Sequence, residues 1–139
     1  MSEQDVEIVR RLNNAFNEAP DRLEAWLAYY HADQEFHAPP EWPEKSVYKG
    51  HEGIAELAEA WFGSFDEYRW DEHELIDAGR CVAALFMHRG RMGTQWVERE
   101  IGAVMYTRDE KVHRVYAFFS WDEALERAGL DPREGSDRA

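Results

Sequence analysis

Residues 31–54 read HADQEFHAPPEWPEKSVYKGHEGI, and the order of residue types in this stretch decides the fold. Its first part predicts a short strand from about Glu35 to Ala38. Pro39 and Pro40 end that strand, because proline has no amide hydrogen to give to a sheet. The loop that follows is expected to be extended and rigid, since the backbone is restricted both at a proline and just before it. A new helix is expected to begin at about Gly50.

The residues on either side of this stretch repeat with helical spacing. Steps of three and four residues predict a first helix, ended by Pro20, whose buried face carries Val6, Val9, Leu12 and Phe16. Asp21 lies three residues before Glu24, a spacing typical of a helix start. The second helix is therefore expected to bury Leu23, Trp26, Leu27 and Tyr30. A third helix is predicted to bury Ile54, Leu57, Ala58, Trp61, Phe62 and Phe65.

After Asp66 the helical repeat gives way to alternation of side-chain types. This alternation predicts strands at about 68–76, 81–91, 96–108 and 112–119, joined by turns. Ser120 and Glu123 have the spacing of a capping box, which predicts a closing helix, and Gly129 suits its C-terminal cap. Helices followed by a meander of strands predict an α+β domain. Its curved, mostly antiparallel sheet is expected to pack against three N-terminal helices.

Composition favours one folded domain, expected at residues 1–130 and followed by a flexible tail at 131–139. The net charge of −13 repels phosphate groups, so neither nucleic acid nor a membrane is an expected partner. The chain has one cysteine and no signal-peptide pattern, which favours a cytoplasmic location. The sequence lacks phosphate-binding loops, dinucleotide fingerprints and zinc-site spacings, so no cofactor or metal is expected.

The order of these pieces resembles the SnoaL-like, polyketide cyclase-like branch of the superfamily that shares the nuclear transport factor 2 fold. The resemblance covers about residues 4–130, and it is carried by the segments ADQEFHAPPEWP, YKGHEGIAE, ELIDAGRCVAAL, YTRDEKVHRVYAF and EALERAGL. It implies a cone-shaped α+β barrel with a pocket between a bent sheet and its helices. The fold hosts both enzymes and non-catalytic binding proteins, so it does not by itself assign a function.

The resemblance also shows where catalytic residues of the superfamily would fall. Steroid isomerases of this fold use an aspartate before a proline and a tyrosine on the first helix. The matching positions here hold Ala38 and Leu12, which can neither move a proton nor donate a hydrogen bond. Dehydratases of the fold use histidines, a class that His37 and His88 match by position type. The late acidic residue of polyketide cyclases falls at Ser120, which is first of all a predicted helix cap.

Two histidines and a group of aromatic residues form the candidate site. His37 and His88 are the candidate catalytic residues, because histidine titrates near neutral pH. Each of them is alternatively an ordinary histidine at the surface or at an interface. The candidate ligand-binding residues present a flat apolar body, often with a polar tip, that suits a ring-shaped ligand. They are Trp26, Tyr30, Trp42, Tyr48, Trp61, Trp70, Tyr106, Tyr116 and Phe118, with Trp42 and Tyr48 expected at the pocket mouth.

Two classes of function follow from these residues. The first is a SnoaL-like small-molecule-binding domain with an aromatic-lined pocket for a small apolar, cyclic ligand. The second is an enzyme without a cofactor, such as a cyclase, isomerase, dehydratase or hydrolase, that uses acid/base chemistry on an apolar cyclic substrate. Loss of the isomerase residues favours the first class, while His37 and His88 keep the second open.

A homodimer is also expected. Both phases of the strand at 81–91 are apolar, with Val82, Ala84 and Phe86 on one face and Ala83, Leu85 and Met87 on the other. A sheet that is apolar on both faces needs cover on both. A second copy of the chain is the simplest cover for the outer face, and a fuller core within one chain is the alternative.

Overall fold

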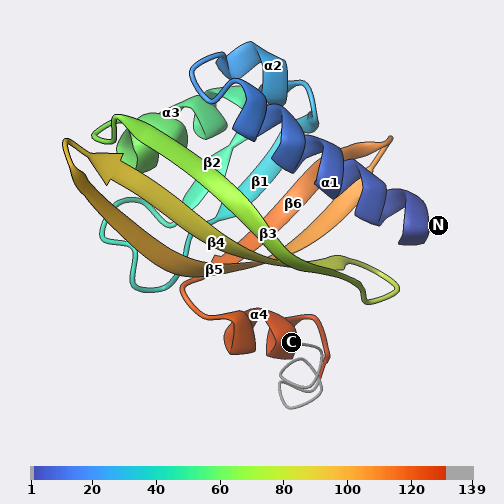
Figure 1. The fold of residues 1–139 in the computed structure, drawn as a ribbon. Helices are drawn as coiled ribbons and strands as arrows, with labels where there is room; N and C mark the ends of the chain where they lie inside the picture. The colour runs from blue at the N-terminus through green and yellow to red at the C-terminus, as the bar shows by residue number, and fades with distance from the viewer. Residues whose placement is uncertain (1, 131–139) are drawn as a thin grey trace.

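The computed structural model describes residues 2–130, which form four helices and a six-stranded sheet. The predicted flexible tail at 131–139 lies outside the described residues. Figure 1 shows three helices on one side of the curved sheet and the last helix on the other. The elements in chain order are α1 (Ser2–Glu18), α2 (Leu23–Leu27), β1 (Tyr30–His37), β2 (Val47–Lys49), α3 (Gly50–Phe62), β3 (Glu67–Asp77), β4 (Val82–Met92), β5 (Gln95–Arg108), β6 (Lys111–Phe118) and α4 (Trp121–Arg127).

The sheet has the strand order β2-β1-β6-β5-β4-β3. Only the β1–β6 pair is parallel, so the predicted α+β class with a mostly antiparallel sheet is confirmed. The expected closed barrel is wrong, because β2 and β3 are the two edges of an open sheet. The three-residue β2 pairs with β1 alone, and β3 pairs with β4 alone, so neither edge reaches the other.

The stretch that decides the fold differs in detail from the prediction. The second helix is shorter than expected, and Tyr30 begins β1 instead of lying on that helix. β1 was predicted too short, because its pairing with β6 is irregular between Tyr30 and Glu35 and its side chains do not alternate. Strand β2 was not predicted, because it lies within the region expected to be a loop. The fully buried Gln34 of β1 holds this segment, since its amide nitrogen donates to the backbone oxygens of Tyr48 and Gly50.

Helix α1 packs on the inner face of the sheet, and its predicted buried residues Val9, Leu12 and Phe16 are at most 1% exposed. Phe16 stacks on Trp70 of β3, with ring centroids 4.0 Å apart and planes 8° apart. The next residue, Asn17, exchanges two hydrogen bonds with the backbone of Trp70, at 2.7 and 2.8 Å. These contacts fix the C-terminal half of α1 to the middle of β3.

Helix α4 covers the outer face of the sheet. Its Ala124 and Leu125 are buried against Ala83, Leu85 and Val104, which belong to the second apolar phase of the strands. The predicted N-cap of α4 is confirmed, since the Ser120 hydroxyl accepts from the Glu123 amide. Gly129 follows the C-cap Ala128 and has a φ of +83°. The predicted Asp21–Glu24 cap of α2 is wrong, because α2 has Arg22 as its N-cap and no side-chain cap hydrogen bond. The homodimer stays a prediction, but its basis is weaker, because this chain covers much of that apolar face with its own helix.

Close contact between α4 and the sheet depends on Gly102. A Cβ at this position would lie 2.6 Å from the Ala124 Cβ and 2.9 Å from the Ser120 oxygen. We therefore expect Gly102→Ala to lower the free energy of unfolding by about 1–3 kcal/mol, measured by urea denaturation. In an Ala124→Gly background the same change should cost clearly less. Equal costs in the two backgrounds would contradict this account of α4 packing.

Candidate functional site

A small, mostly apolar pocket lies between the helices and the inner face of the sheet. Two small side chains on adjacent strands leave space there, because Ala103 of β5 and Ala117 of β6 are paired residues that line the cavity. Ala84 of β4 pairs with Ala103 and continues this row of alanines. The free volume is about 50 Å³. The lining residues are Trp26, Tyr30, Phe36, Ile54, Leu57, Ala58, Trp61, Phe62, Trp70, Phe86, His88, Ile101, Ala103, Met105 and Ala117.

Five of the predicted site residues come together at this cavity. They are Trp26, Tyr30, Trp61, Trp70 and His88, and they belong to α2, β1, α3, β3 and β4. Trp70 and His88 are paired residues of neighbouring strands whose rings stack with planes 14° apart. The side chains therefore converge from elements that lie far apart in the sequence.

Trp42 and Tyr48 lie beside the cavity without lining it. Trp42 stacks on Trp61 with ring centroids 4.7 Å apart, and its indole N–H donates to the Tyr48 hydroxyl at 2.9 Å. Trp42 also lines an open groove outside the cavity, together with Phe119 and Arg99. The Trp42–Trp61 stack thus lies between the cavity and this outer groove.

The other four predicted site residues do not line the cavity. His37, Tyr116, Tyr106 and Phe118 lie on the outer face of the sheet, around the cluster that packs against α4. His37 stacks on Tyr116 at 4.4 Å, and the Arg127 guanidinium of α4 lies 3.8 Å from the centre of the Tyr116 ring. His37 and His88 therefore do not share one cavity, and any role of the outer residues in binding stays a prediction.

A chain of hydrogen bonds holds His88 in the cavity wall. The Trp61 indole N–H donates to the Tyr68 hydroxyl at 3.0 Å, and that hydroxyl lies 3.0 Å from His88 Nδ1. Because an indole nitrogen can only donate, Tyr68 accepts from Trp61 and its own proton is available to His88. The Trp61 N–H, the Tyr68 hydroxyl and His88 Nδ1 all form hydrogen bonds when Nδ1 accepts from Tyr68. The ring proton of neutral His88 is then on Nε2.

Burial sets the protonation state of this pair. His88 is only 7% exposed, and the loss of hydration lowers its pKa from 6.5 to about 3. The same loss of hydration raises the pKa of Tyr68, which outweighs the lowering by the Trp61 hydrogen bond and by the charge of Arg99. At neutral pH both side chains are uncharged, so His88 presents an N–H donor and not a positive charge.

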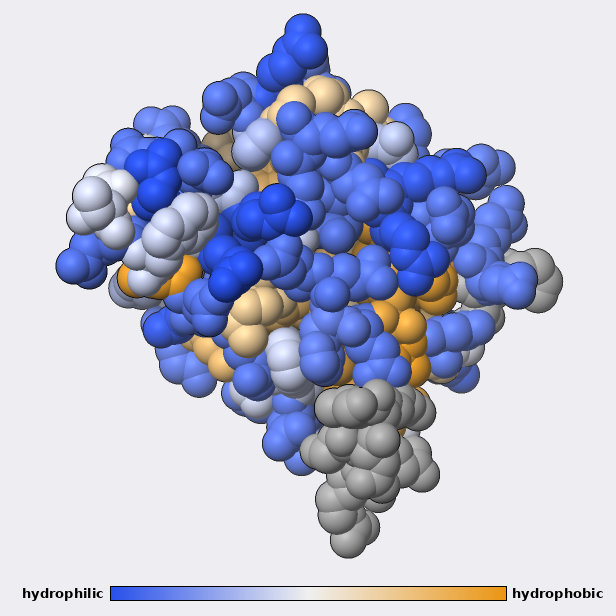
Figure 2. Space-filling view, viewed as in Figure 1, coloured by the Kyte–Doolittle hydropathy of each residue, from blue (hydrophilic) through white to orange (hydrophobic). Residues whose placement is uncertain are grey.

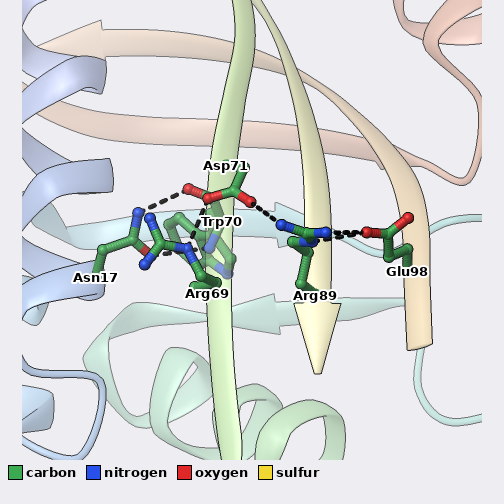
Figure 3. A network of polar contacts seen from close by, with 6 residues as sticks. All are labelled: Asn17, Arg69, Trp70, Asp71, Arg89 and Glu98. Atoms are coloured by element: carbon green, nitrogen blue, oxygen red, sulfur yellow. Dashed lines mark hydrogen bonds and ion pairs between the residues drawn. The ribbon is translucent and has the colours of Figure 1, made fainter. Parts of the chain in front are cut away.

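Charged residues cover the outer face of β3, β4 and β5 on the side of the sheet away from this cavity. Figure 3 shows the ladder, in which Arg89 of β4 binds Asp71 of β3 and Glu98 of β5, and Arg69 also binds Asp71. These side chains are largely exposed, so each pair contributes little to stability. Figure 2 shows a mainly hydrophilic surface in the view of Figure 1, in line with the acidic composition.

Sequence reasoning missed two features of the site. Tyr68 was predicted as a strand residue, but its role as the partner of His88 and Trp61 depends on contacts across two strands and a helix. The row of Ala84, Ala103 and Ala117 was also missed, because strand register joins positions that the sequence separates. The available signal was the presence of single small residues, Ala84, Ala103 and Ala117, between larger apolar side chains at alternate positions of their strands.

Comparison with known protein families identifies the fold family. The SnoaL-like domain matches residues 9–123, which is more than half of the chain. The chain belongs to the SnoaL-like domain family. This confirms the resemblance that the sequence segments indicated.

Solved structures agree with the SnoaL-like assignment. TerC, co-crystallised with polyporic acid, is 18% identical, with a TM-score of 0.71 over 91% of this chain and 98% of that one. An NTF2-like protein from Burkholderia xenovorans is 23% identical, with a TM-score of 0.66 over 92% and 97%. A protein of ketosteroid isomerase-like fold from Catenulispora acidiphila, in complex with trimethylamine, is 17% identical, with a TM-score of 0.65 over 89% and 93%. At these identities the likeness shows the fold alone.

A comparison of this SnoaL-like chain with curated proteins gives no significant match. Within residues 2–130, no helix is both long enough and apolar enough to cross a membrane.

The lowered pKa of His88 predicts a dependence of stability on pH. The unfolded chain gains a proton at this residue below about pH 6.5, whereas the folded chain does not until about pH 3. His88 therefore lowers the free energy of unfolding as pH falls, by about 2 kcal/mol between pH 7 and pH 5. We expect His88→Gln to remove this part of the slope in urea unfolding measured at each pH.

The control for this measurement is His73→Gln. His73 is exposed on β3, where it stacks on Trp121 at 4.1 Å. This variant should keep the wild-type slope. A His88→Gln protein with an unchanged slope would show that His88 is hydrated and titrates in the folded state.

Proposed function

We propose that this SnoaL-like chain binds a small apolar, ring-containing molecule in the cavity between its sheet and its three N-terminal helices. The observation that carries the proposal is a pocket lined by aromatic and aliphatic side chains, with one histidine held in its wall. Such a concave, mostly apolar site with few polar groups is typical of small-molecule binding. Ala103 and Ala117 leave space in its wall, where larger residues would fill the core.

Binding requires the cavity to open. Its volume of about 50 Å³ is about a third of the ~150 Å³ cavity that holds benzene in an engineered protein. The stack of Trp42 and Trp61 is the part most suited to move, because Trp61 lines the cavity while Trp42 lines the open groove outside. A ligand that displaces Trp61 would enter from the side of Phe119 and Arg99.

The protonation state of His88 favours binding over acid/base catalysis. An efficient general acid or base has a pKa near the working pH, whereas burial lowers that of His88 to about 3. His37, the other candidate, lies on the outer face beside Tyr116. Two neighbours of the same fold, TerC with polyporic acid and the Catenulispora protein with trimethylamine, hold small molecules, which supports a binding role.

The homodimer and the cytoplasmic location, both expected from the sequence, remain part of this proposal.

Filling the cavity should weaken binding. Ala103→Val places two extra methyl groups at the centre of the alanine row, and we expect at least a tenfold weaker affinity for indane, since 1.4 kcal/mol of lost contact is about tenfold. The affinity is measured by isothermal titration. The matched control is Ala83→Val. Ala83 lies on β4, next to the Ala84 that pairs with Ala103, but its side chain packs against α4 on the other face of the sheet. This control should lose about 1–3 kcal/mol of stability through overpacking and keep its affinity for indane.

Binding of indane that survives Ala103→Val unchanged, in a protein that is folded by circular dichroism, would place the ligand elsewhere. Weaker binding in Ala83→Val alone would point to the outer face of the sheet.

A further inference from the structure

One edge of β5 has no neighbouring strand. Residues 95–100 pair with β4 on one side, whereas pairing with β6 begins only at Gly102, opposite Phe118. Figure 1 shows the β4–β5 hairpin running past the end of β6. Within residues 2–130, no other strand adjoins this side of residues 95–100. The backbone N–H and C=O groups on this side are therefore free to pair with a further strand.

An open groove of about 770 Å³ lies against this edge. Its walls come from residues 98–100 of β5, from residues 41–43 of the loop before β2 and from Phe119 after β6. Neighbouring strands of a sheet lie about 4.8 Å apart, so a strand added to β5 would occupy the space directly beside its edge. The groove provides this space.

Exposed apolar side chains lie on the same part of β5. Trp96 is 51% exposed and Val97 is 46% exposed. Because side chains alternate along a strand, Trp96 shares one face with Glu98 and Glu100, while Val97 shares the other with Arg99. A strand added at this edge would place its own alternate side chains beside these two sets.

The charges in the groove favour a basic partner. Three carboxylates, those of Glu41, Glu98 and Glu100, line it together with one guanidinium, that of Arg99. The Arg99 guanidinium lies 4.3 Å from the centre of the Phe119 ring. The excess of carboxylates, in a chain of net charge −13, attracts Lys and Arg side chains and repels acidic segments.

A second copy of the chain is a poor occupant of this edge. Pairing the edges of two β5 strands would bring Glu98 and Glu100 of one copy close to the same residues of the other. Like charges that face each other across a strand pair are destabilising. The charges on this edge therefore disfavour self-association and leave it open to a strand of opposite charge.

We propose that residues 95–100 of β5 bind an extended, basic peptide segment of another protein, which adds to the sheet as a further strand. Backbone hydrogen bonds to the free edge supply the affinity, and alternate side chains of the segment supply the specificity. Lys or Arg side chains lie beside Glu98 and Glu100, and apolar side chains lie beside Val97. This inference is independent of the cavity and of what the cavity binds.

The test uses the capped heptapeptide Thr-Lys-Val-Lys-Val-Lys-Thr, in which basic and apolar side chains alternate. Affinity is measured by isothermal titration, and the site is located by ¹H–¹⁵N NMR, with the largest amide shifts expected at residues 95–100. The same peptide N-methylated at its three central residues keeps its charge but loses backbone donors on both edges. We expect it to bind about tenfold more weakly. An acidic peptide with Glu in place of Lys should bind no better than the N-methylated one.

A pair of variants tests the charge of the groove. Glu98 already binds Arg89, whereas Glu41 has no ion pair within residues 2–130, so Glu41 is the carboxylate most open to a partner's cation. We expect Glu41→Lys to weaken binding of the basic peptide about threefold to tenfold. Glu44→Lys is the matched control, because Glu44 is exposed on the same loop and does not line the groove. It changes the net charge equally and should leave the affinity nearly unchanged.

Should Glu41→Lys fail to fold, the three peptides decide on the wild-type protein. Equal affinity for the plain and the N-methylated peptide, or shifts away from residues 95–100, overturns strand addition. Equal losses in the two variants overturn the role of the groove. Shifts of the same amides with protein concentration alone would assign the edge to a second copy and overturn the proposal, as would absence of binding by the basic peptide.

Discussion

The stack of Phe16, Trp70 and His88 is the interaction on which the rest of the structure depends. It joins α1 to β3 and β4, with Phe16 fully buried and Trp70 held at its backbone by Asn17. Each aromatic pair contributes about 0.5–1.5 kcal/mol beyond the burial of its surface. Trp70 and His88 also line the cavity, so the contact that fixes the first helix to Trp70 also shapes the site.

Large rings and small residues play opposite roles at this site. Aromatic side chains from α2, α3, β1 and β3 fill the space between the helices and the sheet. The small side chains of Ala103 and Ala117 leave free volume next to the sheet. The open sheet is sealed on its outer face by α4, whose close approach needs Gly102. The inner cavity and the outer cover therefore have separate determinants, which allows changes in one to leave the other intact.

The sequence predicted the elements better than the site. The spacing of Val9, Leu12 and Phe16 on α1 depends only on helix geometry, so it was readable without any tertiary information. The sequence did not show which face of each strand packs against the helices. Alternation sorts the side chains of a strand into two faces, but it does not say which of the two is the inner one. His37 and His88 show the consequence: irregular pairing of β1 and the register of β4 place them on opposite faces.

The central claim is that the chain holds a mostly apolar cavity between the sheet and its helices, and xenon tests this claim most directly. Dry apolar cavities take up xenon in crystals under pressure. Crystals of this protein exposed to xenon should show one strong anomalous peak among Trp61, Trp70 and Ala103. The peak should disappear in Ala103→Val. Well-diffracting crystals with no xenon at this position, or with ordered water filling it, would contradict the account.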